Sequence, residues 1–143
     1  MTRLLSEDKV LIAAHRGVAG GNIPCNTLPA FEAALRQGAD IIELDVTRSM
    51  DGQLFIFHPG KEAVFLRTER SIERMESREV ERLPLMNQDQ TPTKYHVPRL
   101  EEALKLLRGR CLINLDKFWM WPEEITALVR ELGMQDQVLI KTN

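Results

Sequence analysis

Two acidic residues stand inside a segment that otherwise has the composition of a buried strand. The sequence IIELDV begins at Ile41 and contains Glu43 and Asp45, two positions apart. Because side chains alternate between the two faces of a strand, these carboxylates share one face. The next apolar segment, LFIFH, ends in His58, and Pro59 follows directly. Carboxylates and an imidazole in such segments indicate chemistry at a strand end and not a place in the core.

Two further apolar segments also end in polar residues. VLIAAH ends in His15, and CLINLD ends in Asp116. Neighbouring strands lie about 4.8 Å apart, and ligands of parallel α/β folds bind at the carboxyl ends of the strands. We therefore expect two histidines and three carboxylates to converge at one edge of a sheet.

These residue types predict metal-assisted phosphoryl transfer or hydrolysis. Clustered carboxylates stay ionised only beside a compensating cation, and an all-oxygen ligand set suits Mg²⁺ or Ca²⁺. Histidine, with an unperturbed pKa of about 6.5, suits general acid and base catalysis. Arg16, which follows His15, offers a planar fork of donors for an oxyanion such as phosphate.

Each of these features, taken alone, also fits a structural role. A histidine at a strand end is often simply a hydrogen-bonded part of the fold, and the Glu43–Asp45 pair could form a solvated rim. Asp116 could be paired with the adjacent Lys117. The argument for chemistry therefore depends on their coincidence on one predicted face.

Extended and helical segments alternate along most of the chain. The sequence predicts strands at 10–15, 40–46, 54–58, 111–116 and 137–142, and helices at 27–38, 98–109 and 121–133. This alternation predicts a parallel sheet with right-handed crossovers. The short turn at 49–53 leaves two possibilities open: an antiparallel hairpin, or a barrel position whose helix is replaced by a turn. Residues 61–95 are highly charged and predict a solvated insertion with one short helix at 76–83.

Composition excludes several classes of protein. The 143 residues are 43% hydrophobic and 28% charged, with a net charge of −2, which favours one globular domain over a nucleic-acid or membrane-surface binder. No apolar run approaches the roughly 20 residues of a membrane-spanning helix. Two isolated cysteines and the lack of a convincing signal peptide predict a cytoplasmic location.

The segment from Ala14 to Gly60 resembles the opening of the glycerophosphodiester phosphodiesterase family. That family has the patterns H-R-G, P-E-N-T-x-x-A-F, G-A-D-x-I-E-x-D-V and D-G-x-x-V-x-H-D, and this chain matches them in order and spacing. The segments FLRTERSIERMESREVERL, VPRLEEAL and LINLDK resemble later parts of the family more faintly.

The resemblance implies a (β/α)8 barrel that cleaves glycerophosphodiesters to glycerol phosphate and an alcohol. It implies that residues 61–95 are an insertion after the third strand. It assigns the divalent metal, Mg²⁺ or Ca²⁺, to Glu43, Asp45 and Asp116, and acid and base catalysis to His15 and His58. One histidine would protonate the departing alkoxide.

The resemblance also implies which cationic side chains would bind the substrate phosphate. The resemblance assigns Arg16 to the phosphate. The family has lysine two positions after the strand-end acid, but Phe118 stands there and Lys117 comes one position early. If the strand continued, Lys117 would point to the opposite face. Lys141, near the end of the last strand, is therefore predicted as the substitute cation.

Two further departures from the family pattern predict reduced activity. Cys25 stands where the family has glutamate, and a thiol cannot replace a carboxylate as a ligand of Mg²⁺ or Ca²⁺. Pro59 stands where the family has aspartate after the histidine. Proline fixes φ and removes an N–H donor.

Length is the largest departure. Five predicted strands are present, whereas such a barrel needs eight strands and about 250 residues. We expect residues 1–143 to form a single partial barrel domain, either a fragment or a homo-oligomer that covers its open sheet edges. Two alternatives stay open: a non-catalytic half-barrel that binds a phosphorylated ligand or a partner, and a phosphodiesterase of the phospholipase C or D type.

Overall fold

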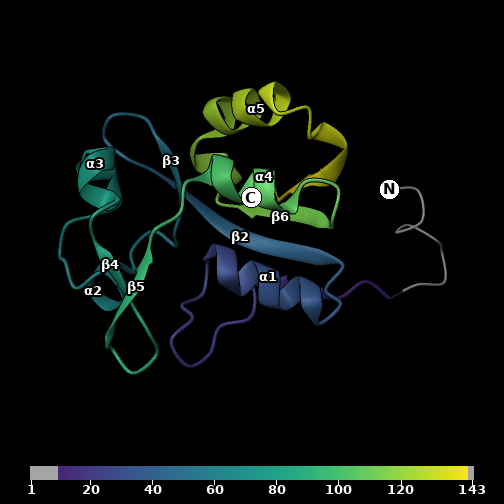
Figure 1. The fold of residues 1–143 in the computed structure, drawn as a ribbon. Coiled ribbons are helices and arrows are strands. Elements are labelled where there is room, and N and C mark those ends of the chain that lie inside the picture. The colour runs from purple at the N-terminus through teal and green to yellow at the C-terminus, as the bar shows by residue number, and fades with distance from the viewer. Residues whose placement is uncertain (1–9, 142–143) are drawn as a thin grey trace.

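The central feature of the computed structural model, which describes residues 10–141, is a parallel sheet. Its strands are β1 (Ala13–His15), β2 (Ile41–Arg48), β6 (Leu112–Asp116) and β7 (Val138–Ile140). They lie in the order β1-β2-β6-β7, and all three pairings along this path are parallel. Figure 1 shows the paired strands β2 and β6 side by side. The α/β class predicted from the sequence is confirmed.

Three helices cover one face of this sheet. They are α1 (Leu28–Arg36), α4 (Leu100–Leu107) and α5 (Pro122–Glu131). Their buried apolar side chains form one core with Ile42, Leu44 and Val46 of β2. Since side chains alternate along a strand, Glu43 and Asp45 lie on the opposite face of β2. The helical core thus fixes the orientation of the strand that carries the acids.

The third predicted strand is antiparallel and lies outside the parallel path. In β3 (Leu54–Ile56), Ile56 pairs with Val46 and Leu54 pairs with Arg48 of β2. The open question about the 49–53 turn is thereby answered in favour of a hairpin, as the Asp-Gly turn allows. The described residues thus contribute four parallel strands to the sheet, and not five. His58 lies in the loop after β3.

The prediction for residues 61–95 is wrong in one respect, because this insertion packs into a second buried core that it shares with β3 and the residues next to it. It contains α2 (Glu62–Phe65), a 3₁₀ turn (Ile72–Arg74) and α3 (Ser77–Val80), followed by the antiparallel hairpin of β4 (Pro84–Met86) and β5 (Pro92–His96). Apolar side chains that are scattered among charged residues in the sequence meet in a second buried cluster: Phe55, Phe57, Leu66, Ile72, Met75, Val80, Leu85 and Val97. In Figure 1 this unit lies beside the parallel sheet, next to β3.

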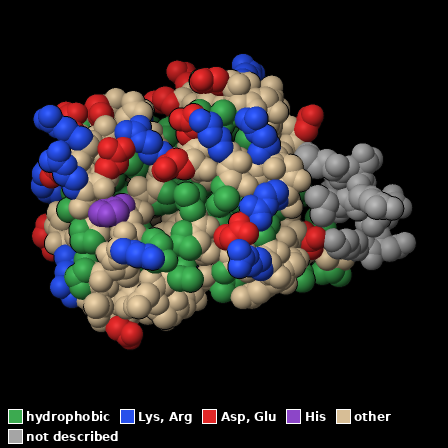
Figure 2. All heavy atoms as spheres, viewed as in Figure 1, with side chains coloured by type: hydrophobic (Ala, Val, Ile, Leu, Met, Phe, Trp, Pro, Cys, Tyr) green, Lys and Arg blue, Asp and Glu red, His purple; other side chains and the backbone are tan. Residues whose placement is uncertain are grey.

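The surface has mixed charge, and among the described residues no further strand pairs with the outer edge of β1 or β7. Acidic and basic side chains are interspersed over the face in Figure 2, around apolar side chains near its middle. The outermost strands, β1 and β7, are flanked or formed by exposed apolar residues, among them Ile12 and Leu139. Among the described residues, no helix combines the length and the apolar character needed to cross a membrane.

Candidate active site

Strand register brings the three predicted metal ligands together. Asp45 of β2 is paired with Asp116 of β6, and Glu43 is paired with His15 of β1 on the other side. One ligand-capable oxygen from each of Glu43, Asp45 and Asp116 lies within 4.8 Å of the others. The predicted convergence at the carboxyl ends of the strands is therefore present in the structure.

Asp45 is the fully buried centre of this cluster. Its Oδ2 atom accepts a hydrogen bond of 2.8 Å from Nδ2 of Asn26 and lies 2.9 Å from Nε of Arg16 in an ion pair. Its Oδ1 atom is buried and has no hydrogen-bond partner among the described residues. Burial of a carboxylate is costly unless it is paired and hydrogen-bonded, and Arg16 and Asn26 supply these partners.

The loop after β1 reaches Asp45 through a left-handed backbone. Arg16 and Asn26 have φ values of 60° and 57°. The backbone N–H of Arg16 donates to the backbone oxygen of Glu43 at 2.9 Å and to its Oε2 atom at 3.1 Å. Gly17, with φ of 75°, lies so close to α1 that a Cβ atom there would be 2.7 Å from the backbone of Ala30. This tight packing holds the loop against the acidic cluster.

The two predicted catalytic histidines lie on either side of the acids. Nε2 of His15 is 3.9 Å from Oε2 of Glu43, and the His15 side chain is 71% exposed. Nε2 of His58 is 4.0 Å from Oδ1 of Asp45, and the His58 side chain is 25% exposed. Nδ1 of His58 lies 2.8 Å from the backbone oxygen of Pro59. Since a carbonyl oxygen only accepts, Nδ1 of His58 is the donor in this hydrogen bond, and Nε2 is the ring nitrogen that faces Asp45.

Glu43 and Asp116 have pKa values shifted in opposite directions. Burial raises the pKa of Glu43, and the negative charges of Asp45 and Asp116 add to the rise. Burial also acts to raise the pKa of Asp116, but hydrogen bonds from Lys117 and the positive charges of Lys117 and Lys141 outweigh it and lower that pKa. The difference comes from cations on the β6 side of the cluster.

Lys117 takes a position that differs from the one expected for an extended strand. β6 ends at Asp116, and Lys117 adopts the left-handed conformation with φ of 63°. Its Nζ atom therefore returns to the strand end and lies 2.9 Å from Oδ2 of Asp116. Lys141 follows β7, and its charge acts on Asp116. Both lysines thus contribute positive charge to this edge of the sheet.

Cys25 lies next to the acids, where the family pattern has a carboxylate. Burial raises the pKa of its thiol; the positive charge of Arg16 opposes this rise, and the negative charge of Asp45 adds to it. Cys25 lines a cavity of about 10 Å³ together with Arg16, Asn26 and His58. That volume holds at most about one water molecule. The thiol is therefore part of the packed floor of the site.

Asn26 was not among the predicted site residues, although it lies in the segment that matches the family pattern P-E-N-T. The contact of Lys117 with Asp116 was not predicted either. The return of Lys117 toward Asp116 depends on one backbone torsion, for which the sequence carried no signal.

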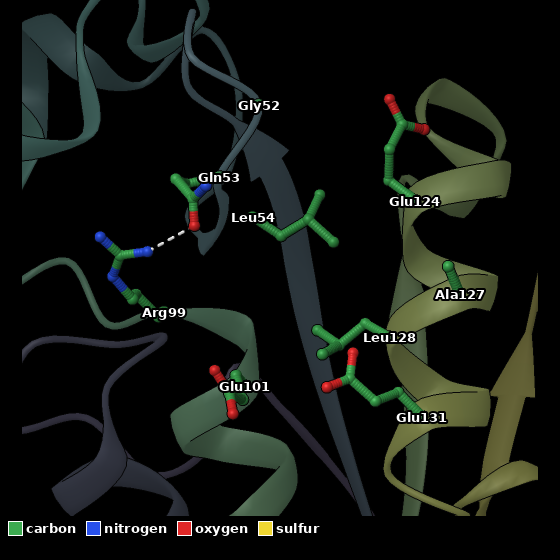
Figure 3. Close-up of a pocket in the computed structure, with 9 residues that line it drawn as sticks. All are labelled: Gly52, Gln53, Leu54, Arg99, Glu101, Glu124, Ala127, Leu128 and Glu131. Carbon is green, nitrogen blue, oxygen red and sulfur yellow. Dashed lines mark hydrogen bonds between the residues drawn. The ribbon is translucent and has the colours of Figure 1, made fainter.

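A larger hollow of about 320 Å³ lies elsewhere in the molecule (Figure 3). In Figure 3, hydrogen-bonded Gln53 and Arg99 stand on one side of this hollow, and Leu128 and Glu131 of α5 stand on the other. None of the predicted catalytic, phosphate-binding or metal-binding residues lines it. The candidate site is accordingly the acidic cluster at the carboxyl ends of the strands.

A parallel α/β sheet with polar residues at the carboxyl ends of its strands is the ligand-binding arrangement of barrel proteins. The model of the glycerophosphoryl diester phosphodiesterase family matches residues 15–139, and this chain belongs to that family. A glycerophosphodiester phosphodiesterase of Bacillus altitudinis is 32% identical over an alignment of 140 positions, which covers 92% of this chain and 57% of that protein.

Solved structures agree with this family membership. The crystal structure of a glycerophosphodiester phosphodiesterase from Agrobacterium tumefaciens matches with a TM-score of 0.79 and 33% identity, over 93% of this chain and 57% of that one. A phosphodiesterase from Oleispira antarctica, solved in complex with the product sn-glycerol-3-phosphate, matches with a TM-score of 0.69 and 27% identity, over 92% of this chain and 56% of that one. The fold is thus that of a (β/α)8 barrel, of which this chain spans a little over half.

Proposed function

We propose that this chain carries the metal-binding and acid–base half of a glycerophosphodiester phosphodiesterase. The reaction is hydrolysis of a phosphodiester, most specifically a glycerophosphodiester, to glycerol phosphate and an alcohol. The observation that carries the proposal is the convergence of Glu43, Asp45 and Asp116 within 4.8 Å, with His15 and His58 each about 4 Å from one of these acids.

The three carboxylates fit a divalent cation. Their donor set is all oxygen, as Mg²⁺ and Ca²⁺ prefer. Oδ1 of Asp45 and Oδ1 of Asp116 are buried without hydrogen-bond partners among the described residues, and such atoms are costly unless a ligand satisfies them. When bound, the cation would offset the negative charge of the phosphate oxygens.

The histidines then divide the proton transfers between them. Hydrolysis forms a bond from a water oxygen to phosphorus and breaks the bond from phosphorus to the alcohol oxygen. His58, whose Nε2 carries the lone pair in the neutral ring, accepts the proton of the attacking water. His15 in its protonated form donates a proton to the departing alkoxide. The carbonyl of Pro59 holds the His58 ring at Nδ1, so the proline preserves its orientation without a neighbouring acid.

The two predicted phosphate ligands, Arg16 and Lys141, differ in their contacts with the acidic cluster. Nε of Arg16 already faces Asp45, so Arg16 would bind phosphate through the other N–H groups of its guanidinium. Lys141 is exposed at the end of β7, and its charge already acts on Asp116. It would move toward a phosphate bound beside the acids.

The experiment is a hydrolysis assay on the purified chain with glycerophosphocholine and with bis-p-nitrophenyl phosphate, in Mg²⁺, in Ca²⁺ and in excess chelator. Turnover should require the cation and should fall at least about 100-fold in His58→Ala, the usual size of a general-base contribution. His96→Ala is the matched control, because His96 is an exposed residue of β5 outside the site. Turnover that survives chelation would contradict the metal proposal.

A second function, binding without catalysis, is favoured by specific observations. Cys25 replaces an acid of the family pattern, and in the described part of the chain no further strand pairs with the outer edge of β1 or β7. On this alternative the chain binds a phosphorylated ligand, or a second copy covers the edges. Binding of glycerol 3-phosphate without turnover, or a dimer in light scattering that Leu139→Lys disrupts, would favour it. The free thiols of Cys25 and Cys111 are compatible with the predicted cytoplasmic location.

A further inference from the structure

Lys117 occupies an unusual place beside the acidic cluster. It is the residue directly after β6, and its backbone is left-handed, with φ of 63° and ψ of 13°. A non-glycine residue adopts this conformation only at a cost in free energy. Strain of this kind persists only where surrounding contacts enforce it, and it is common at functional sites.

The strained backbone changes which side of the strand the lysine reaches. In a continued strand, Lys117 would point away from the face that carries Asp116. Instead, its Nζ atom lies 2.9 Å from Oδ2 of Asp116 and 5.3 Å from the ring centre of Trp119. The lysine side chain is 22% exposed and that of Asp116 is 19% exposed. The ammonium is thus held on one side by a carboxylate and on the other by an aromatic ring.

This ammonium competes for the same carboxylate that a divalent ion would use. Asp116 is one of three acids whose oxygens lie within 4.8 Å of one another; Arg16 is paired with Asp45, and Lys117 is paired with Asp116. A protonated amine cannot be a metal ligand. A divalent ion bound to these acids and the ammonium of Lys117 would repel each other. The ion would thereby weaken the ion pair between Lys117 and Asp116.

We propose that Lys117 is a tethered counter-ion of the acidic cluster, which partly neutralises the acids when no divalent ion is bound and is displaced from Asp116 when one binds. Lys117 is therefore a positioning residue that sets the affinity of the site for the ion. This inference rests on the proposed function, because it assumes that the three acids bind a divalent cation.

The test measures Ca²⁺ and Mg²⁺ affinity by isothermal titration calorimetry on the full chain and its variants. Lys117→Met removes the charge at similar size and should tighten ion binding by about tenfold. Lys117→Gly should tighten it equally while relieving the left-handed backbone. Lys117→Arg keeps the charge and should bind like the original chain. Lys105→Met is the control, because Lys105 pairs with Glu101 on α4, outside the site, and it should change nothing.

Thermal unfolding separates this role from a purely structural one. Without the ion, Lys117→Met should unfold at a lower temperature than the original chain, because the acids repel one another. With saturating ion, the difference should disappear or reverse. A lower unfolding temperature in both conditions, or equal ion affinity in Lys117→Met, would overturn the inference and leave the proposed metal site standing. If neither the original chain nor any variant binds an ion, both the proposed metal site and this inference are wrong.

Discussion

Asn26 offers a sharp test of how the buried acid is held. Its Nδ2 atom donates to Oδ2 of Asp45 at 2.8 Å, in a fully buried pair. A hydrogen bond to a charged acceptor contributes about 1.5–3 kcal/mol. Asn26 also has φ of 57°, a conformation that asparagine tolerates better than alanine. Asn26→Ala should therefore lower the free energy of unfolding by about 3 kcal/mol, from both causes together.

Asn26→Gly separates the two causes. Glycine adopts the left-handed conformation freely, so this variant loses the hydrogen bond without the backbone strain and should be roughly 1 kcal/mol more stable than Asn26→Ala. The assay is urea denaturation followed by circular dichroism. Asn22→Ala is the control, since exposed Asn22 accepts only a neutral hydrogen bond from Asn87, and it should cost less than about 1 kcal/mol.

The refuting result for Asn26 is clear. A loss below about 0.5 kcal/mol in Asn26→Ala would mean that Arg16 alone, in its 2.9 Å ion pair with Asp45, suffices to keep the buried carboxylate. Equal losses in the alanine and glycine variants would show that the left-handed backbone at position 26 carries no strain. The first result would remove Asn26 from the set of residues that position the acidic cluster, and the second would assign its whole effect to the hydrogen bond with Asp45.

Three other substitutions follow from the same contacts. Cys25→Glu restores the carboxylate of the family pattern and should raise phosphodiester turnover at least several-fold, whereas Cys25→Ser should not; equal rates in both would show that the thiol only packs. The folded-state pKa of Glu43 is raised. The protonated form of Glu43 therefore contributes its full stabilisation below the unfolded-state pKa of about 4.3, and this contribution is lost as pH rises through the folded-state pKa. Glu43→Gln should therefore unfold at higher urea than the original chain at pH 7 and at the same urea near pH 3; a lower midpoint at pH 7 contradicts the sign. Gly17→Ala should cost more than about 2 kcal/mol, because its Cβ would lie 2.7 Å from the Ala30 backbone, whereas Gly52→Ala, also at positive φ but in open space, should cost only the roughly 1–2 kcal/mol of the torsion.

Local patterns predicted the parts of the fold that depend on neighbouring residues in the sequence. Alternation in IIELDV placed Glu43 and Asp45 on one face, and the structure has them there, opposite Ile42 and Leu44. Their proximity to Asp116 depends on the β2–β6 register. The position of Asp116 at a strand end indicated this contact, but no local pattern specifies which strands are neighbours.

The core of the insertion could not be predicted from periodicity. Its buried side chains, such as Leu66, Met75 and Val80, are separated by charged residues and belong to short turns and to a hairpin. No single segment of 61–95 therefore shows a helical or alternating apolar pattern long enough to indicate burial. The apolar residues meet only through tertiary packing against Phe55 and Phe57, which lie in and next to β3.

The opposite pKa shifts of Glu43 and Asp116 determine how the site responds to protons and to cations. Burial and its acidic neighbours raise the pKa of Glu43, whereas Lys117 and Lys141 overcome burial and lower that of Asp116. As pH falls, Glu43 therefore takes up a proton before Asp116 does. A divalent ion needs both carboxylates ionised, so proton competition acts mainly at Glu43 and ammonium competition acts at Asp116. Substitutions on the two sides should consequently alter ion affinity differently: changes at Lys117 should shift it at every pH, and changes near Glu43 should shift it most in acid.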